Sequence, residues 1–283
     1  MPGIAVSGLI TATSPPPQER MHSLLTVPGV NLGDPGGRWE MGVNIWGYPT
    51  AVPDLWAPCA DEGTMREKES DSEQPQAGFE GFEMYVPVFC SARGNARELA
   101  ERALAVLRAT QAWGVEKALA HGIVGMSNKH LVDSDLTSLA TGVSARVGIS
   151  YLEKAIAATG RQGLIHITPS VADAADGALM EPSQASDPVY TQAGTPVAIG
   201  AGYVGADPSI DQPALSAPGA TTDWIFATGP VEVRIEDDPR QLPEDIAEAL
   251  DRTNNDLVYR AEKTAVVGWD TALQVGVLVN WAS

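Results

Sequence analysis

The sequence predicts an α+β protein, and three patterns along the chain support that fold class. A segment with helical period begins at Asn95 and continues to Gly122. The C-terminal third consists mainly of short apolar or alternating runs, which are typical of strands that pair antiparallel. The 28 glycines and 21 prolines among 283 residues exceed their usual combined share of about 12%. We therefore expect long turns and loops between the regular elements.

The chain is acidic, with 36 Asp and Glu against 18 Lys and Arg and a formal net charge of −18. Proteins that read DNA sequence neutralise phosphates with an excess of basic side chains, so this composition argues against specific DNA binding. A hydrophobic fraction of 44% is enough for a core and argues against a disordered chain. The length allows one large domain or two of ordinary size.

Cysteine content and the first residues bear on the compartment. Cys59 and Cys90 are too few for the disulfide framework of a small secreted domain. A reducing compartment is the simpler interpretation, and a single bridge between the two stays open. Residues 1–17 lack the basic start of a secretory signal, and no uncharged apolar run reaches the roughly 18 residues of a membrane span. We expect a soluble protein with no membrane partner.

The first 92 residues show little periodicity. The polar run 61–76 lies between the apolar segments 46–56 and 79–90, and this arrangement predicts a long hairpin with a charged tip. The second flank alternates apolar and other residues, as a strand with one buried face does. The apolar positions of that face are Phe82, Met84, Val86 and Val88. A disordered linker is the alternative interpretation.

Two helices are predicted after the hairpin. Asn95 is a suitable N-cap with Glu98 three residues later, and the pattern up to Gly122 predicts about 26 helical residues, roughly 39 Å in length. A second helix is predicted over 144–159, with Gly160 as its C-cap. Its inward positions are predicted to be Val147, Tyr151, Leu152, Ala155 and Ile156.

Short strands and loops are predicted for the rest of the chain. The run 163–168 is predicted to be a buried strand, after which Thr168 and Pro169 open a short helix that ends near Gly177. Further strands are predicted over 195–200, 224–228, 231–236, 256–267 and 273–281. Because the last of these has apolar residues at every second position, we expect one of its faces in the core.

One motif is typical of a nucleotide-binding enzyme. Residues Gly200–Gly205 have G-x-G-x-x-G spacing directly after a predicted strand, where glycines would let the backbone approach a pyrophosphate. No helix is predicted after the motif, because Pro208 and Pro213 interrupt the segment. A tight glycine turn is the favoured interpretation, and a dinucleotide-dependent enzyme is the alternative.

Other signs of chemistry are weak. The four histidines lack zinc-ligand spacing, and His166, in an apolar strand, is expected to be a hydrogen-bonded core or interface residue. Residues Glu236–Asp238 could suggest a cation site but lack the spacing of a calcium loop, so a solvated turn is favoured. No convergent set of catalytic groups is visible. We expect no catalytic residue, no metal ligand and no cofactor, and thus no enzyme.

The order of the segments is more informative than any single motif. The informative stretches are Gln162–Pro169, Gly194–Ile199, Asp223–Gly229, Val231–Ile235, Tyr259–Lys263 and Val275–Trp281. In these stretches and in their order, the chain resembles the major capsid proteins of tailed phages. Their fold is the Hong Kong 97-type fold, which encapsulin shells share. The resemblance covers most of the chain.

The resemblance implies a Hong Kong 97-like capsid architecture. In that family an extended arm precedes a long two-stranded loop, a spine helix, an axial domain and a peripheral sheet that the C-terminal strands complete. The corresponding segments would be 1–45 for the N-terminal arm, 46–92 for the extended hairpin loop, 93–139 for the spine helix and peripheral domain, 140–222 for the axial domain, and 223–283 for the return strands of the peripheral domain.

The resemblance also implies a function. The chain would be a structural protein that assembles into hexamers and pentamers of an icosahedral bacteriophage capsid around double-stranded DNA. It would be located in the virion and, during assembly, in the host cytoplasm, with portal, scaffold or cement proteins as further partners. Packaged DNA would be contacted only non-specifically, because an acidic protein does not hold it tightly. An encapsulin-like nanocompartment shell is the alternative within the same fold.

Aromatic residues in the arm and loop are the expected contact sites between subunits. An isolated hairpin is marginally stable in water, so such segments gain stability by packing on neighbours, where aromatic side chains contribute much of the binding energy. The candidates for contact between subunits are Trp39, Trp46, Trp56, Phe79 and Phe82. For the tryptophans, the alternative is a place in the chain's own core.

Overall fold

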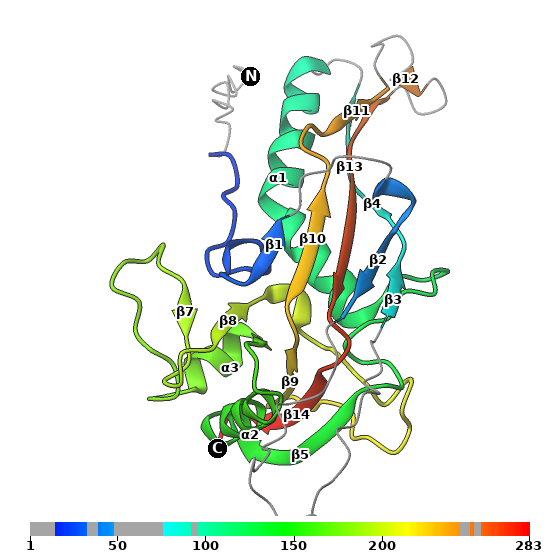
Figure 1. The fold of residues 1–283 in the computed structure, drawn as a ribbon. Coiled ribbons are helices and arrows are strands. Elements are labelled where there is room, and N and C mark those ends of the chain that lie inside the picture. The colour runs from blue at the N-terminus through cyan, green and yellow to red at the C-terminus, as the bar shows by residue number, and fades with distance from the viewer. Residues whose placement is uncertain (1–14, 33–38, 48–75, 92–95, 244–249, 252–255) are drawn as a thin grey trace, which may run out of the picture.

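The computed structural model describes residues 15–32, 39–47, 76–91, 96–243, 250–251 and 256–283. Two six-stranded sheets, a two-stranded ribbon and one long helix make up most of this part of the chain. We call the sheet beside the long helix the upper sheet and the other the lower sheet, after their places in Figure 1.

The helices are α1 (Ala96–His121), α2 (Ala145–Ala158) and α3 (Pro169–Ala174), with 3-10 turns η1 (Leu24–Thr26), η2 (Trp39–Met41) and η4 (Ala201–Tyr203). The upper sheet contains β1 (Val30–Leu32), β4 (Phe82–Ser91), β10 (Val231–Ile235), β11 (Arg240–Leu242), β12 (Leu250–Asp251) and β13 (Asp256–Trp269). The lower sheet contains, in spatial order, β5 (Thr137–Ser144), β14 (Gln274–Asn280), β9 (Thr222–Thr228), β6 (Leu164–Ile167), β8 (Pro196–Ile199) and β7 (Val189–Tyr190). The ribbon pairs β2 (Val43–Trp46) with β3 (Gln76–Phe79).

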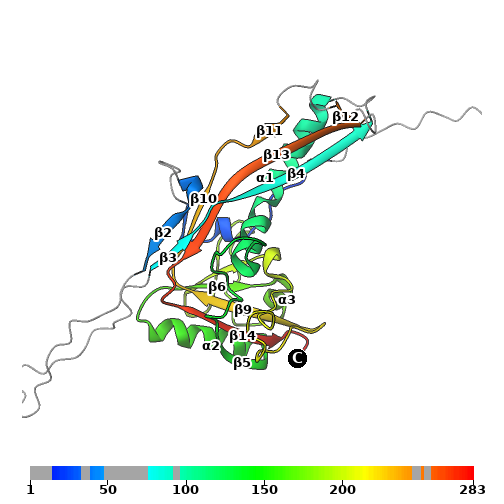
Figure 2. The ribbon, with the colours of Figure 1, turned by 90° about the vertical axis from the view of Figure 1, so that its right-hand side faces the viewer.

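The long helix predicted from the sequence is present as α1. It spans 26 residues, about 39 Å at 1.5 Å per residue, and Gly122 follows it with a positive φ of 69°. Leu99, Ala103 and Leu107 pack from α1 against β4 and β13. Figure 2 shows these two strands side by side along the helix, reaching well beyond the lower sheet.

The predicted hairpin is present only at its base in the described part of the chain, since residues 48–75 lie outside it. β2 and β3 pair antiparallel, with Val43 opposite Phe79. The predicted second flank, 79–90, is divided between two strands, because β3 ends at Phe79 and β4 begins at Phe82. Between them, a side chain at Gly81 would collide with the carbonyl oxygen of Glu40. β3 pairs with β2, whereas β4 pairs antiparallel with β13.

The central strands of the lower sheet are buried on both faces. β6 and β14 bury almost every residue, which agrees with their runs of consecutive apolar side chains. α2 and α3 cover one face of the sheet and share a hydrophobic cluster with it. Leu273, Val275, Val277 and Val279 belong to this cluster, so the predicted inward face of the last strand is confirmed.

The buried stripe of α2 differs from the predicted one. Val147 and Tyr151 are 43% and 40% exposed, although both were expected to point inward. The buried positions are Ala145, Gly148, Ile149, Leu152 and Ile156. Gly148 is the reason for the shift: a side chain there would overlap Val279, so the helix lies against β14 along its glycine.

The C-terminal strands divide between the two sheets. The sequence analysis expected residues 223–283 to return together to one sheet. β10 and β13 pair in the upper sheet. β9 and β14 instead pair with each other in the middle of the lower sheet, where β14 also joins β5 and β9 joins β6. Strands that are apolar on both faces need cover on both faces, and the middle of the lower sheet provides it.

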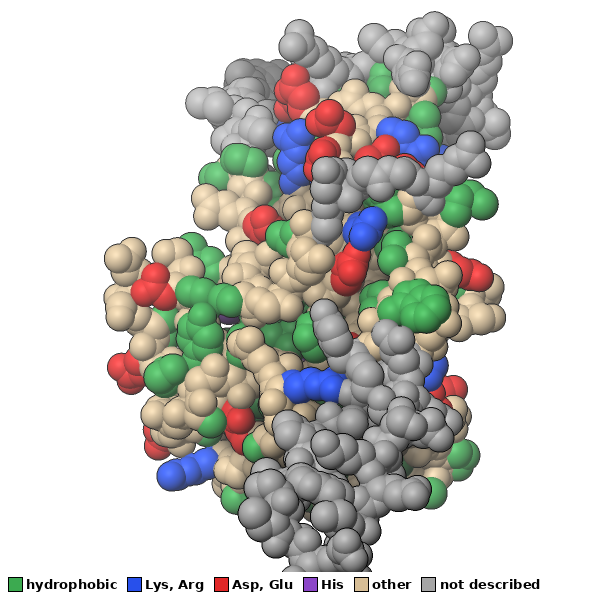
Figure 3. Space-filling model, in the orientation of Figure 1, with side chains coloured by type: hydrophobic (Ala, Val, Ile, Leu, Met, Phe, Trp, Pro, Cys, Tyr) green, Lys and Arg blue, Asp and Glu red, His purple; other side chains and the backbone are tan. Residues whose placement is uncertain are grey.

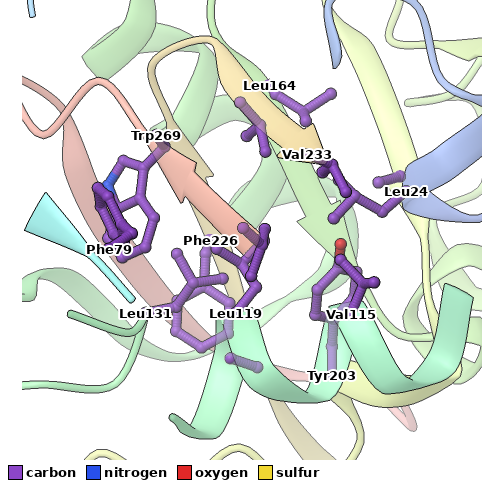
Figure 4. Packing of buried hydrophobic residues seen from close by; sticks show 14 of the residues in the cluster. Leu24, Phe79, Val115, Leu119, Leu131, Leu164, Tyr203, Phe226, Val233 and Trp269 are labelled. Carbon is purple, nitrogen blue, oxygen red and sulfur yellow. The ribbon is translucent and has the colours of Figure 1, made fainter. Parts of the chain in front are cut away.

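A common hydrophobic core connects the two sheets. Figure 4 shows Val115 and Leu119 of α1 in this core together with Phe226 of β9 and Val233 of β10. The core therefore contains side chains from the long helix and from both sheets. Because protein cores are close-packed, this shared core fixes how the upper sheet sits on the lower one.

Candidate functional site

Among the residues that the structure describes, the upper sheet has one covered and one largely open face. α1 packs on the first face, and the ribbon lies over one end of the second, where Phe79 and Ile45 lie against Gly268. Further along the second face, Phe89 is 73% exposed, Tyr85 61% and Val258 40%. We call Tyr85, Pro87, Phe89, Val258 and Arg260 the outer patch. Figure 3 looks onto this side of the molecule and shows hydrophobic side chains exposed among charged ones over the upper sheet.

Strand register brings the outer patch together. Phe89 lies opposite Val258 in the antiparallel pair of β4 and β13, and Pro87 lies opposite Arg260, so their side chains project from the same face. Along β4, the predicted inward face is confirmed: Phe82 is buried, and Met84, Val86 and Val88 pack toward the core. The intervening positions held a signal that the sequence analysis missed, because most of them are aromatic or apolar instead of charged.

The charge within the outer patch is balanced by its neighbours. The guanidinium of Arg260 lies over the ring of Tyr85, 5.9 Å from the centroid, and forms an ion pair with Glu262. Phe89 and Val258 remain as open apolar surface. Contiguous exposed apolar and aromatic surface of this kind marks sites of interaction with other proteins. The outer patch is therefore suited to contact with another apolar surface.

Four of the five predicted contact residues lie in the described part of the chain. Trp39, Phe79 and Phe82 are 4%, 1% and 7% exposed, so they pack in the chain's own core and have little surface left for a neighbour. For Trp39 this is the alternative that the sequence analysis kept open. Trp46, at the end of β2, is 61% exposed and remains a candidate. Trp56 lies outside the described residues.

One side-chain amide binds the connection between β3 and β4. Asn128 Oδ1 accepts the backbone N–H of Glu80 at 2.7 Å, and Asn128 Nδ2 donates to the carbonyl of Glu80 at 2.9 Å. The amide thus satisfies both backbone groups of Glu80, as a neighbouring strand would. This pair holds the ribbon to the loop that follows α1.

The glycine motif does not form a phosphate site. Ala201–Tyr203 is a single 3-10 turn packed on α1, so the motif does not begin an α-helix. The N–H of Gly202 donates to Glu116 Oε2 at 3.0 Å, and an added Cβ on Gly202 would lie 2.5 to 2.6 Å from atoms of α1. The backbone N–H of Gly202 is therefore already hydrogen-bonded, and α1 occupies the space beside it that a phosphate would need. The favoured interpretation, a tight glycine turn, is confirmed.

His166 is a core residue, as predicted. Its ring is fully buried and is hydrogen-bonded to Tyr203 Oη at 3.0 Å and Thr228 Oγ1 at 2.9 Å. Burial lowers the pKa of His166 to about 3, so the ring is neutral at physiological pH. An enclosed neutral imidazole whose two nitrogens both have protein partners is a structural group.

The acidic turn Glu236–Asp238 lies at the surface. Glu236 accepts the backbone N–H of Thr264 at 3.1 Å and lies 3.6 Å from the guanidinium of Arg240. Within the described residues, no group of three or more His, Cys, Asp or Glu side chains is arranged to hold a metal ion. Cys59 lies outside the described residues, so its pairing with Cys90 stays open.

The sequence matches no protein-family model and no curated protein. Solved structures, in contrast, match almost the whole chain. The capsid of the native GTA particle has a TM-score of 0.54 at 14% identity, with 99% of this chain and 97% of that chain covered. The structure of phage G major capsid and decoration proteins has a TM-score of 0.51 at 9% identity and full coverage, 100% of both chains. A chain of Mycobacterium phage Ogopogo has a TM-score of 0.51 at 13% identity, with 99% of this chain and 96% of that chain covered.

The chain has a phage capsid fold. This finding confirms the α+β class and the Hong Kong 97-like capsid fold that the resemblance implied. Across the described residues, no helix has both the length and the apolar character that crossing a bilayer demands.

Proposed function

We propose that the protein is a shell subunit that assembles with copies of itself into the hexamers and pentamers of an icosahedral phage capsid. The capsid fold, matched over nearly the full length of the chain, is the observation that carries this proposal. In this role the protein is structural and not catalytic. It is located in the virion, and in the host cytoplasm while the shell assembles.

The open face of the upper sheet supports a role in assembly. Phe89 and Tyr85 expose most of their surface, and covering apolar area stabilises by about 25 cal/mol per Å². The outer patch therefore favours association once a neighbouring surface is available. We propose the outer patch and Trp46 as contact sites between subunits.

The segment assignment follows from the same proposal. Residues 1–45 would act as the arm, 46–92 as the extended loop, and α1 as the spine of the subunit. Portal, scaffold or cement proteins would be further partners. Double-stranded DNA would lie inside the shell without tight contacts, because the net charge of −18 repels phosphates.

Size measurement with surface variants tests the proposal. We expect the purified chain to run as megadalton particles or capsomers by sedimentation velocity. Exchanging both patch aromatics, Tyr85→Ser with Phe89→Ser, should leave folded subunits that assemble poorly. The control Phe89→Leu keeps an apolar side chain and should assemble normally.

Two outcomes would contradict different parts of the proposal. An unmodified chain that stays monomeric at high concentration would refute the shell function. A double variant that assembles as well as the unmodified chain would remove the outer patch from the contact and leave the shell function standing. The contents of purified particles, DNA or protein, would separate a phage capsid from a nanocompartment shell.

A further inference from the structure

A buried carboxylate lies at the middle of the molecule, on α1. Glu116 is only 2% exposed, although its neighbours Val115, Leu119 and Ala120 form part of the hydrophobic core. Burying an ionised carboxylate is costly unless hydrogen bonds or an opposite charge compensate for the lost water. The partners of Glu116 therefore indicate why it is there.

Both oxygens of Glu116 accept backbone N–H groups from distant segments. Oε1 accepts the N–H of Leu24 at 3.0 Å, and Oε2 accepts the N–H of Gly202 at 3.0 Å. Leu24 belongs to the N-terminal segment, and Gly202 to the turn that follows β8 in the lower sheet. One side chain of the long helix thus connects the N-terminal segment to the turn of the lower sheet.

The connection depends on the ionised form of the carboxylate. A carboxylate has acceptor sites on both oxygens, whereas a protonated carboxyl group has one hydroxyl that acts as a donor. Two N–H donors cannot both keep good acceptors when one oxygen carries a proton. Burial raises the pKa of Glu116 above its usual range, against the opposing effect of the two backbone N–H groups and Arg20. Proton uptake therefore begins at a higher pH than for an exposed Glu.

Other titratable groups lie near this joint. Arg20 from the N-terminal segment and Tyr203 from η4 act on Glu116 directly. His121 of α1 lies near Gly202 and Lys117, and burial lowers the pKa of His121. His166, from β6, lies behind Tyr203. An experiment on Glu116 therefore has to distinguish the effect of protonating Glu116 from the effect of protonating the histidines.

We propose that Glu116 is a proton-sensitive joint between the N-terminal segment, the long helix and the lower sheet. In the ionised form it holds Leu24 and Gly202 on α1 together. Protonation releases one of the two backbone groups from its charged acceptor and loosens its segment at that point. The N-terminal segment keeps a second attachment nearby, since the carbonyl of His22 accepts the N–H of Ile199 at 2.8 Å, so the release is local.

Glu153 provides a matched control. Its carboxylate accepts two hydroxyl groups, from Thr191 and from Thr195, the latter at 2.9 Å. Hydroxyl groups can rotate and act as donor or acceptor, whereas a backbone N–H can only donate. A proton or an amide at Glu153 is therefore tolerated, while the same change at Glu116 is not.

Amide hydrogen exchange over a pH series tests the joint. Protection factors at Leu24 and Gly202, normalised for the intrinsic exchange rate at each pH, should be high near neutral pH. At about pH 4, one of the two should fall roughly tenfold to a hundredfold, the loss expected when a donor loses a charged acceptor. In Glu116→Gln, the protection factor of that amide should be low at both pH values. In Glu153→Gln, the protection factors of Leu24 and Gly202 should change with pH as they do in the unmodified chain.

The wild-type pH series is decisive even if Glu116→Gln fails to fold. Protection at both amides that stays constant down to about pH 4 would overturn the proposal. A folded Glu116→Gln variant with the full pH response of the unmodified chain would also overturn it, because the response would then belong to His121 or another neighbour.

Discussion

In the lower sheet, β6, β9 and β14 bury nearly every side chain, whereas β4 in the upper sheet buries one face and exposes the other. The lower sheet lies between α2 with α3 on one side and the shared core on the other. Among the described residues, α1 packs on one face of the upper sheet, and the ribbon covers one end of the other face. Two phenylalanines illustrate the contrast: Phe226 in the lower sheet is 0% exposed, whereas Phe89 in the upper sheet is 73% exposed.

The difference in burial between the two sheets indicates two roles of apolar residues. In the lower sheet they stabilise the subunit, because their surface is already removed from water. On the open face of the upper sheet they contribute little to the isolated subunit and are available for a neighbour. A capsid subunit needs both kinds, a body that folds alone and surfaces that become buried on assembly.

The largest expected effect is the difference in unfolding free energy between alanine variants of Phe226 and Phe89. Phe226→Ala should destabilise the subunit by about 3–5 kcal/mol, since it leaves a cavity in a core that cannot collapse around it. Phe89→Ala should change the stability of the dissociated subunit by less than about 0.5 kcal/mol. Urea unfolding of dissociated subunits measures both. Equal losses would show that the upper sheet is as self-sufficient as the lower one.

The next effect concerns the contact between α1 and the turn of the lower sheet. Gly202→Ala places a methyl group against Glu116, Lys117 and the carbonyl of Trp113. We expect a loss of about 1–3 kcal/mol, typical of overpacking. Gly177→Ala is a control for glycine replacement, since Gly177 has a positive φ of 66° but no atom near the added Cβ. A loss at Gly202 no greater than at Gly177 would contradict the close-packing explanation.

A smaller effect depends on pH and on His166 in the lower sheet. Its pKa is about 3 when folded and about 6.5 when unfolded, so the unfolded chain binds a proton first as the pH falls. The stability contributed by His166 is therefore present above about pH 6.5 and is lost toward pH 3, by at most about 1.4 kcal/mol per pH unit. His166→Gln should reduce this slope in urea titrations at several pH values. An unchanged slope would mean that His166 is not the group responsible.

The smallest effect is expected at the ribbon. Trp46→Ser should alter subunit stability by no more than about 0.5 kcal/mol, because the side chain is already largely in water. Its effect should appear in the concentration at which particles form. Thermal melting of dissociated subunits checks the first expectation, and a large drop in melting temperature would show that Trp46 supports its own chain.

Much of the fold was predictable because local patterns decide it. The helical period predicted α1, the apolar run at 163–168 predicted the buried strand β6, and the alternating apolar residues after Leu273 predicted one inward face of β14. The partition of strands between the sheets was not predictable, because it depends on which faces meet in the shared core. The division of the second flank at Gly81 was not predicted either, since Gly81 lies against Glu40, 41 residues earlier in the sequence.

The burial of the candidate contact residues could not be predicted from the sequence. Aromatic type suggested Trp39, Phe79 and Phe82, which the structure buries within their own chain, because burial depends on tertiary packing that a sequence pattern does not contain. Phe89 and Tyr85 had a readable signal, as apolar residues on the outward side of an alternating strand. Glu116 was also detectable as a lone acid between Val115 and Leu119, although its partners Leu24 and Gly202 were not.

Electron microscopy of the purified full-length chain tests the central claim most directly. The capsid fold and the open apolar face of the upper sheet predict closed, roughly spherical particles of uniform diameter, or the capsomers from which they form. Dispersed single subunits under all conditions that keep the protein folded would contradict the account.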